Sequence, residues 1–104
     1  MKRITVPDFH GKPQKYVAQL DIATEQAEAQ WGTHELSEDD LGPWLTFAFI
    51  LSSGTLAALV REVDNAPSPG YILTAIGDRD PGETLAEFLA ESGISAERVL
   101  HQGF

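Results

Sequence analysis

The chain has 104 residues, a length that suits one domain built around a single hydrophobic core. It has no cysteine, which excludes disulfide bonds, a thiolate nucleophile and cysteine-type zinc sites and suits a reducing cytoplasm. A formal net charge of −9 repels nucleic-acid phosphates, and no apolar run approaches the roughly 20 residues of a membrane span. We therefore expect a cytoplasmic domain that binds neither nucleic acid nor membranes.

The charge is unevenly distributed along the chain. Residues 1–15 carry four basic residues and one acid, a net charge of +3, whereas residues 16–104 carry three basic residues and fifteen acids, a net charge of −12. We interpret residues 1–104 as one domain in which a basic N-terminal edge segment precedes an acidic body. Such a body attracts a basic protein partner and speeds the encounter with it. The alternative is that the acidity only keeps the domain soluble.

The first predicted element is a short edge strand over residues 2–6, followed by a loop over residues 8–13, which are rich in glycine, proline and charge. Two patterns then compete over residues 14–31. Apolar residues alternate with polar ones at the start of this stretch, as in a half-buried strand, but apolar residues also recur through it at helical spacing.

We favour a strand up to Ala23 and then a short helix over residues 25–31, with a single helix over residues 14–31 as the alternative. Thr24 can cap the short helix, because its hydroxyl can accept a hydrogen bond from a free N–H in the first turn. Gly32 can end the helix.

Residues 33–43 are polar and acidic. Ser37 followed by Asp40 resembles a capping box, which is typical of the start of a helix. Gly42 and Pro43 break any helix that begins there. We therefore expect at most a single helical turn on the surface.

Residues 44–63 hold the densest apolar run in the chain and are predicted to form a central hairpin. Two strands would be joined by a tight turn at Ser53 and Gly54, because glycine adopts the positive φ that such turns need. The aromatic and β-branched content of the first arm favours a strand. Residues 55–63 also fit one face of a helix capped by Thr55, and this alternative stays open.

The last part of the chain contains the clearest local signals. A strand is predicted over residues 71–76. A helix is predicted over residues 81–92, because Asp80 can cap it, proline occupies its first position and Gly93 can end it. Residues 99–100 offer a last short strand or turn.

These elements together predict the fold class. A loop is expected over residues 64–70, which contain two prolines and a glycine. The helix would complete a β-α-β unit if residues 99–100 paired in parallel with residues 71–76. The chain is thus expected to form an α+β domain with a mixed or antiparallel sheet, built on the central hairpin, and one or two helices packed on one face.

The sequence contains no complete pattern of metal-binding or catalytic residues. His34 begins a segment that resembles a zinc-protease motif, but Glu38 stands where the second histidine ligand would be. Asp78 and Asp80 resemble the start of a calcium loop, whose later bidentate acid is replaced by Leu89. We expect no metal, no cofactor and no catalytic residue, which favours a role other than that of an enzyme.

The most specific functional signal is a group of acids placed between two tryptophans. Four acids fall within six residues of the polar segment 33–43. Tryptophan is a common buried anchor at interfaces, and carboxylates complement a basic partner. The predicted partner-binding residues are Trp31, Glu35, Glu38, Asp39, Asp40 and Trp44. The alternative is that both tryptophans belong to the core and that the acids form a solvated loop.

We therefore expect a small acidic protein-binding module, such as an inhibitor, an immunity-type protein or an adaptor, that engages a basic partner. One alternative is a small-molecule-binding or enzymatic domain with a pocket beside the sheet, where His101, Tyr71 or Asp78 would supply polar contacts. Another is a homodimer that pairs through an exposed edge strand, either residues 2–6 or residues 71–76.

Overall fold

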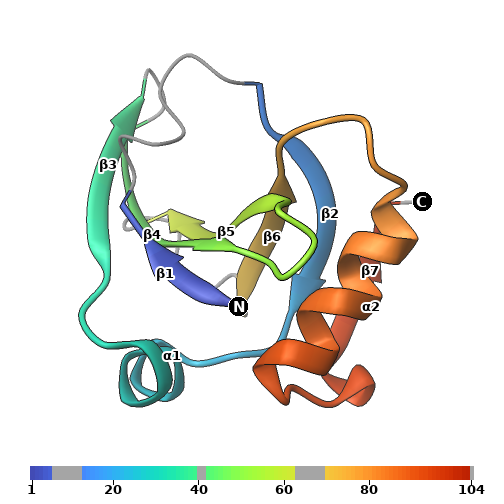
Figure 1. Ribbon diagram of the computed structural model, residues 1–104. Helices are drawn as coiled ribbons and strands as arrows, with labels where there is room; N and C mark the ends of the chain where they lie inside the picture. Colours follow the sequence, from blue (N-terminus) through green and yellow to red (C-terminus); the bar gives the residue numbers. More distant parts are fainter. Residues whose placement is uncertain (6–12, 40–41, 63–69, 104) are drawn as a thin grey trace.

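The computed structural model describes residues 1–5, 13–39, 42–62 and 70–103, and these residues form one α+β domain (Figure 1). The predicted fold class is confirmed, and the sheet is antiparallel throughout its described pairings. The helices are α1 Thr24–Trp31 and α2 Pro81–Ser92, with a 3-10 turn at Ala96–Arg98. The strands are β1 Lys2–Ile4, β2 Lys15–Leu20, β3 Glu35–Asp39, β4 Gly42–Ile50, β5 Leu56–Glu62, β6 Tyr71–Ala75 and β7 Val99–Gln102.

The strands follow the order β1-β4-β5-β6-β2-β7, and β3 also pairs with β4. β3 pairs with the first five residues of β4 and β1 with its last three, while β5 pairs along the other side of β4. β3 and β1 therefore share one outer edge of the sheet, and β7 forms the opposite edge. Most of the predicted loops over residues 8–13 and 64–70 lies outside the described residues.

The central hairpin is confirmed by the pairing of β4 with β5. Its register runs from Trp44 opposite Glu62 to Ile50 opposite Leu56, so the helical alternative for its second arm is wrong. Gly54 has a φ of +90°, which supplies the positive φ expected of the turn. Strand side chains alternate between the two faces, and both faces of β4 are largely apolar, so burial of both faces stabilises the strand conformation.

The preferred interpretation of residues 14–31, a strand followed by a short helix, is also confirmed. The helix cap was placed one residue too late, since Ala23 occupies the N-cap position. The hydroxyl of Thr24 instead lies 2.9 Å from the hydroxyl of Tyr71. Gly32 ends the helix with a φ of +87°, and its N–H donates to the carbonyl of Glu28.

The prediction of at most one helical turn within residues 33–43 is wrong, because residues 35–39 form β3. The local capping pattern is overridden by pairing with β4, which engages five consecutive residues of the segment. Asp40, which would have completed the capping box, lies outside the described residues.

Helix α2 has the predicted bounds, and its caps are those expected from the sequence. The carboxylate of Asp80 accepts a hydrogen bond from the N–H of Glu83, and Gly93 is left-handed with a φ of +77°. The pairing of the flanking strands differs from the prediction. β2 lies between β6 and β7, so these two strands run in the same direction without touching. For the same reason β6 is an internal strand, and the proposed dimer edge at residues 71–76 is wrong.

The main core lies between the sheet and both helices (Figure 1). Phe47 and Phe49 of β4 meet Phe88 of α2, Ala27 of α1 and other buried residues there. Each large apolar side chain buried in this way contributes about 1.5–3 kcal/mol to folding. The other face of β4 and β5 holds a smaller cluster around Ala48 and Ala58, with no helical residue in it.

Candidate functional site

The sheet ends at β3 in a regular, unbulged edge. All five residues of β3 pair in unbroken register with β4, from Glu35 opposite Thr46 to Asp39 opposite Gly42. β3 has no second strand partner among the residues that the structure describes. A strand in this position presents the N–H and C=O groups of alternate residues to any segment that can pair with them.

The composition of this edge is acidic. The five residues of β3 read ELSED, with three acids and no basic residue, and we call this strand the acidic edge. Leu36, the single large apolar residue in it, is 66% exposed. Leu36 lies opposite Leu45, which packs against the main core. The acidic edge is thus attached to the core through β4 while its own leucine stays in solvent.

Trp31, one of the predicted partner-binding residues, packs into the main core. Its ring centroid lies 5.0 Å from that of Phe49, 6.1 Å from that of Phe47 and 6.3 Å from that of Phe88. Trp31 is the last residue of α1, so its ring fastens the end of the helix to the sheet. Its aromatic surface is occupied by the core of the protein itself.

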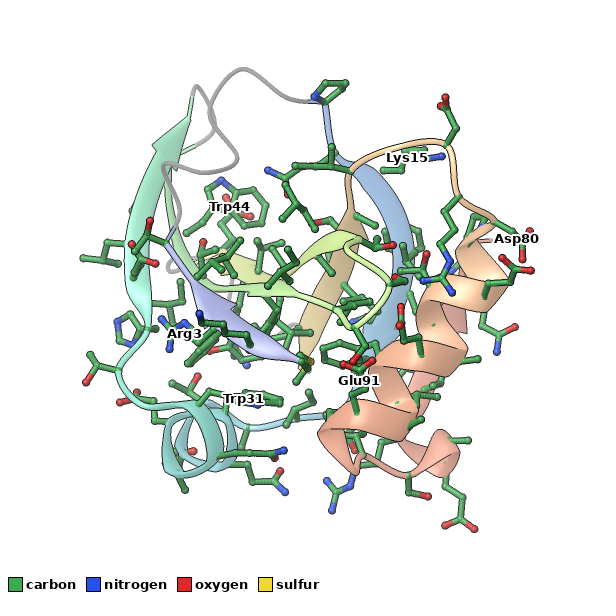
Figure 2. The ribbon with its side chains drawn as sticks, in the orientation of Figure 1. Arg3, Lys15, Trp31, Trp44, Asp80 and Glu91 are labelled. Atoms are coloured by element: carbon green, nitrogen blue, oxygen red, sulfur yellow. The ribbon has the colours of Figure 1, made fainter. Side chains whose placement is uncertain are left out.

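Trp44 lies on the other face of the sheet from Trp31, because strand residues alternate and Trp44 stands three positions before Phe47. Figure 2 shows the two tryptophans well apart. Trp44 is half-buried, and its indole Nε1 is buried without a hydrogen-bond partner in the described part of the chain. The structure therefore does not bring the two tryptophans together.

The acids of the predicted site are placed along the acidic edge itself. Glu35 lies opposite Thr46, on the same face of the sheet as Trp44. Glu38 is paired with Pro43, and Asp39 with Gly42. The remaining predicted residue, Asp40, lies outside the described residues.

Arg3 holds the segment that leads into β3, a role that the sequence analysis missed. From β1, its Nη1 donates to the carbonyl of Trp31 and its Nη2 to the carbonyl of Thr33, both at 2.8 Å. Its guanidinium carbon lies 4.9 Å from the centroid of the Phe47 ring, which is a favourable cation–π position. Arg3 therefore joins the sheet to the end of α1 and to the start of the acidic edge (Figure 2).

A second polar cluster joins the β4–β5 turn to α2. Glu87 accepts hydrogen bonds from the Ser53 hydroxyl at 2.7 Å and the Ser53 N–H at 2.9 Å, and it pairs with Arg79. The hydroxyl of Ser53, followed by the Arg79 guanidinium, lowers the pKa of Glu87 from 4.5 to about 2. A carboxylate with so low a pKa is a weak base, so this arrangement suits a structural clasp better than activation of Ser53.

The residues considered for a pocket do not converge. Tyr71 is 1% exposed and faces the main core, where burial raises the pKa of its hydroxyl. His101 stands opposite Gln19, on the other face of the sheet, and its Nδ1 lies 2.9 Å from the hydroxyl of Tyr16. Asp78 is exposed in the turn that precedes α2.

The second histidine with a described partner is His34, whose Nδ1 lies 3.3 Å from Oε1 of Glu28. Within the described ranges, no group of three histidine, aspartate or glutamate residues is arranged to hold a metal ion. Neither described helix is long and apolar enough to cross a membrane.

Comparison of the chain with protein-family models, with curated protein sequences and with solved structures found no match in any of the three. The functional argument therefore depends on the arrangement of the chain's own residues.

Proposed function

We propose that this protein is an acidic protein-binding module, of the inhibitor, immunity or adaptor type, that engages a basic partner through the acidic edge. One observation supports the proposal above the others. The sheet ends in a regular strand that carries three acids and a leucine exposed to two-thirds of its surface. Within the described residues no second strand pairs with this edge, so it combines a charge that attracts a basic surface with main-chain N–H and C=O groups that a bound segment can pair with.

Electrostatics favours a basic protein as the ligand. Residues 16–104 carry a net charge of −12, which accelerates encounter with a positively charged surface and repels nucleic acid. Leu36 adds an apolar contact, and interfaces typically combine such a contact with a polar rim. Trp31 is not needed as an anchor in this proposal, because its ring packs in the main core.

The test compares the protein with a variant of the acidic edge for binding to purified proteins of isoelectric point above about 9. The variant carries Glu35→Gln, Glu38→Gln and Asp39→Asn, which changes the net charge from −9 to −6. We expect the protein to bind at least one basic protein at low salt, and the variant to bind it at least about tenfold more weakly.

A matched control removes three exposed acids from other parts of the surface. It carries Glu25→Gln, Asp78→Asn and Glu97→Gln and has the same net charge of −6. We expect it to bind as the unmodified protein does. Equal losses in both variants would show that only overall charge matters and would overturn the assignment to β3, as would the absence of binding to every basic protein.

A further inference from the structure

We propose that the basic partner binds by adding an extended strand to the outer side of β3, and that lysine or arginine alternates with apolar residues in that strand. This inference rests on the proposed function and specifies both the binding mode and the kind of segment recognised. Strand addition uses main-chain hydrogen bonds for affinity and alternate side chains for specificity.

The backbone of β3 is the best prepared of the described edges for such pairing. β3 has five residues in unbroken register with β4. β7, at the opposite edge, has four residues and a register shift opposite Gln19 and Leu20, and bulges of this kind disrupt the ladder of an edge strand. β1 has only three residues.

The charge of β3 favours a basic strand over a second copy of this chain as the segment that pairs with it. Charged residues on an edge strand protect it against pairing with another copy, because like charges would stand opposite each other. Two acidic edges side by side would bring six acids together, so a second copy of this chain is disfavoured. Glu35 and Asp39 stand at positions of β3 that share one face, so basic residues at alternate positions of the added strand would form attractive cross-strand pairs with these two acids, whereas Glu38 shares its face with Leu36.

The apolar residues of the proposed partner strand are inferred from Leu36. It is the most exposed of the large hydrophobic residues in the described chain, and it lies near the start of β3. A side chain of the added strand that stands beside Leu36 would remove its apolar surface from water. The partner strand is therefore expected to carry valine, isoleucine or leucine between its basic residues.

The test uses a fluorescent peptide of about eight residues in which lysine and valine alternate, titrated with the full chain at low salt and followed by anisotropy. Two further peptides have the same sequence, each with N-methyl groups on alternate residues, so that each loses the N–H donors of one edge. A fourth peptide places all its lysines before all its valines.

We expect the parent peptide to bind, and both the acidic-edge variant and the fourth peptide to weaken binding at least about tenfold. One N-methylated peptide should lose at least about tenfold in affinity and the other should not, because a bound strand uses only one of its edges for pairing. In hydrogen exchange, alternate amides of β3 should become protected by the peptide while amides of β7 should not.

The outcomes separate this inference from the proposed function. If both N-methylated peptides bind as the parent does and the acidic-edge variant still loses affinity, charge attraction is real and strand addition is wrong. If the parent peptide does not bind while basic proteins do, the binding mode is likewise overturned and the proposed function stands. If sedimentation shows a dimer whose formation protects β3, the occupant is a second copy and the inference fails.

Discussion

Arg3 and Trp31 are joined by a hydrogen bond that spans 28 positions of the chain. The guanidinium of Arg3, in the first strand, donates to the main-chain carbonyl of Trp31, at the end of α1. Carbonyl groups in the last turn of a helix lack partners within the helix, so a cation satisfies them well. The same side chain reaches Thr33, two residues before β3. Arg3 thus joins the segment between α1 and β3 to the sheet, in addition to the pairing of β3 with β4.

Replacing Arg3 by methionine should therefore destabilise the fold. Arg3→Met keeps an apolar stem and removes two charge-assisted hydrogen bonds and the cation–π contact with Phe47, so we expect a loss of about 2 kcal/mol in the free energy of unfolding. Urea denaturation measures it. Lys2→Met is the matched control, because Lys2 is an exposed neighbour in the same strand, and it should change stability by less than about 0.5 kcal/mol. Equal effects of the two substitutions would contradict the assigned role of Arg3.

The clasp between the β4–β5 turn and α2 predicts a dependence of stability on acidic pH. The pKa of Glu87 falls from 4.5 to about 2 in the folded state, chiefly because the Ser53 hydroxyl donates to it. A lowered pKa in the folded state means that the stabilisation is complete above about pH 4.5 and is lost as the pH falls toward 2. The Glu87→Gln variant should be less stable than the protein at pH 7, and this difference should shrink across that interval.

The measurement for Glu87 is a series of denaturation curves from about pH 7 to about pH 2. Glu97→Gln serves as the control, because Glu97 is an exposed acid in the 3-10 turn. A difference between the protein and the Glu87→Gln variant that stays constant with pH would show that the clasp does not depend on the charge of Glu87.

Trp31 and Leu36 should separate stability from binding. Trp31→Ala removes a ring that contacts three phenylalanines and should cost about 3 kcal/mol of stability. Leu36→Ala removes an exposed side chain and should cost less than about 0.5 kcal/mol, while it weakens binding of the lysine–valine peptide. Thermal unfolding and peptide anisotropy measure the two effects. Unchanged peptide binding by the stable Leu36→Ala variant would show that this leucine lies outside the interface.

Two glycines with positive φ should respond very differently to alanine. A Cβ on Gly70 would lie 1.7 Å from the carbonyl oxygen of Leu20, whereas a Cβ on Gly77 would meet no atom within 4 Å. Gly77→Ala should cost about 1–2 kcal/mol, from its backbone conformation alone. Gly70→Ala must in addition push the end of β2 away from the start of β6. The loss in the free energy of unfolding should therefore clearly exceed that of Gly77→Ala. Similar midpoints of urea denaturation for the two variants would contradict the close approach.

The elements that could be predicted from the sequence are those fixed by interactions between residues close together in the chain. The bounds of α2 were predictable because Asp80 and Gly93 act on neighbouring N–H and C=O groups. The central hairpin was predictable because the aromatic and β-branched residues of its first arm and the turn glycine lie within one short segment. β3 was missed because its polar sequence has no apolar alternation, and only the backbone of β4 makes it a strand.

The candidate site was also predictable only in part from the sequence. The acidic character of residues 35–39 is evident from the sequence, but nothing local places these residues at the edge of the described sheet. The sequence likewise does not show long-range neighbours. Trp31 was predicted as a partner-binding residue, and its ring packs against the main core. Residues 71–76 were considered as a dimer edge, and β6 lies inside the sheet.

The amino-acid sequence by itself determined the bounds and caps of α2, the central hairpin, and the negative net charge of residues 16–104. The tertiary structure decided which strand lies beside which, and therefore which of the described strands lie at an edge of the sheet and which tryptophan packs against the main core. The physical reason is that propensity, capping and periodicity act over a few residues, whereas strand pairing joins residues far apart in the chain, and its outcome depends on all the competing partners at once.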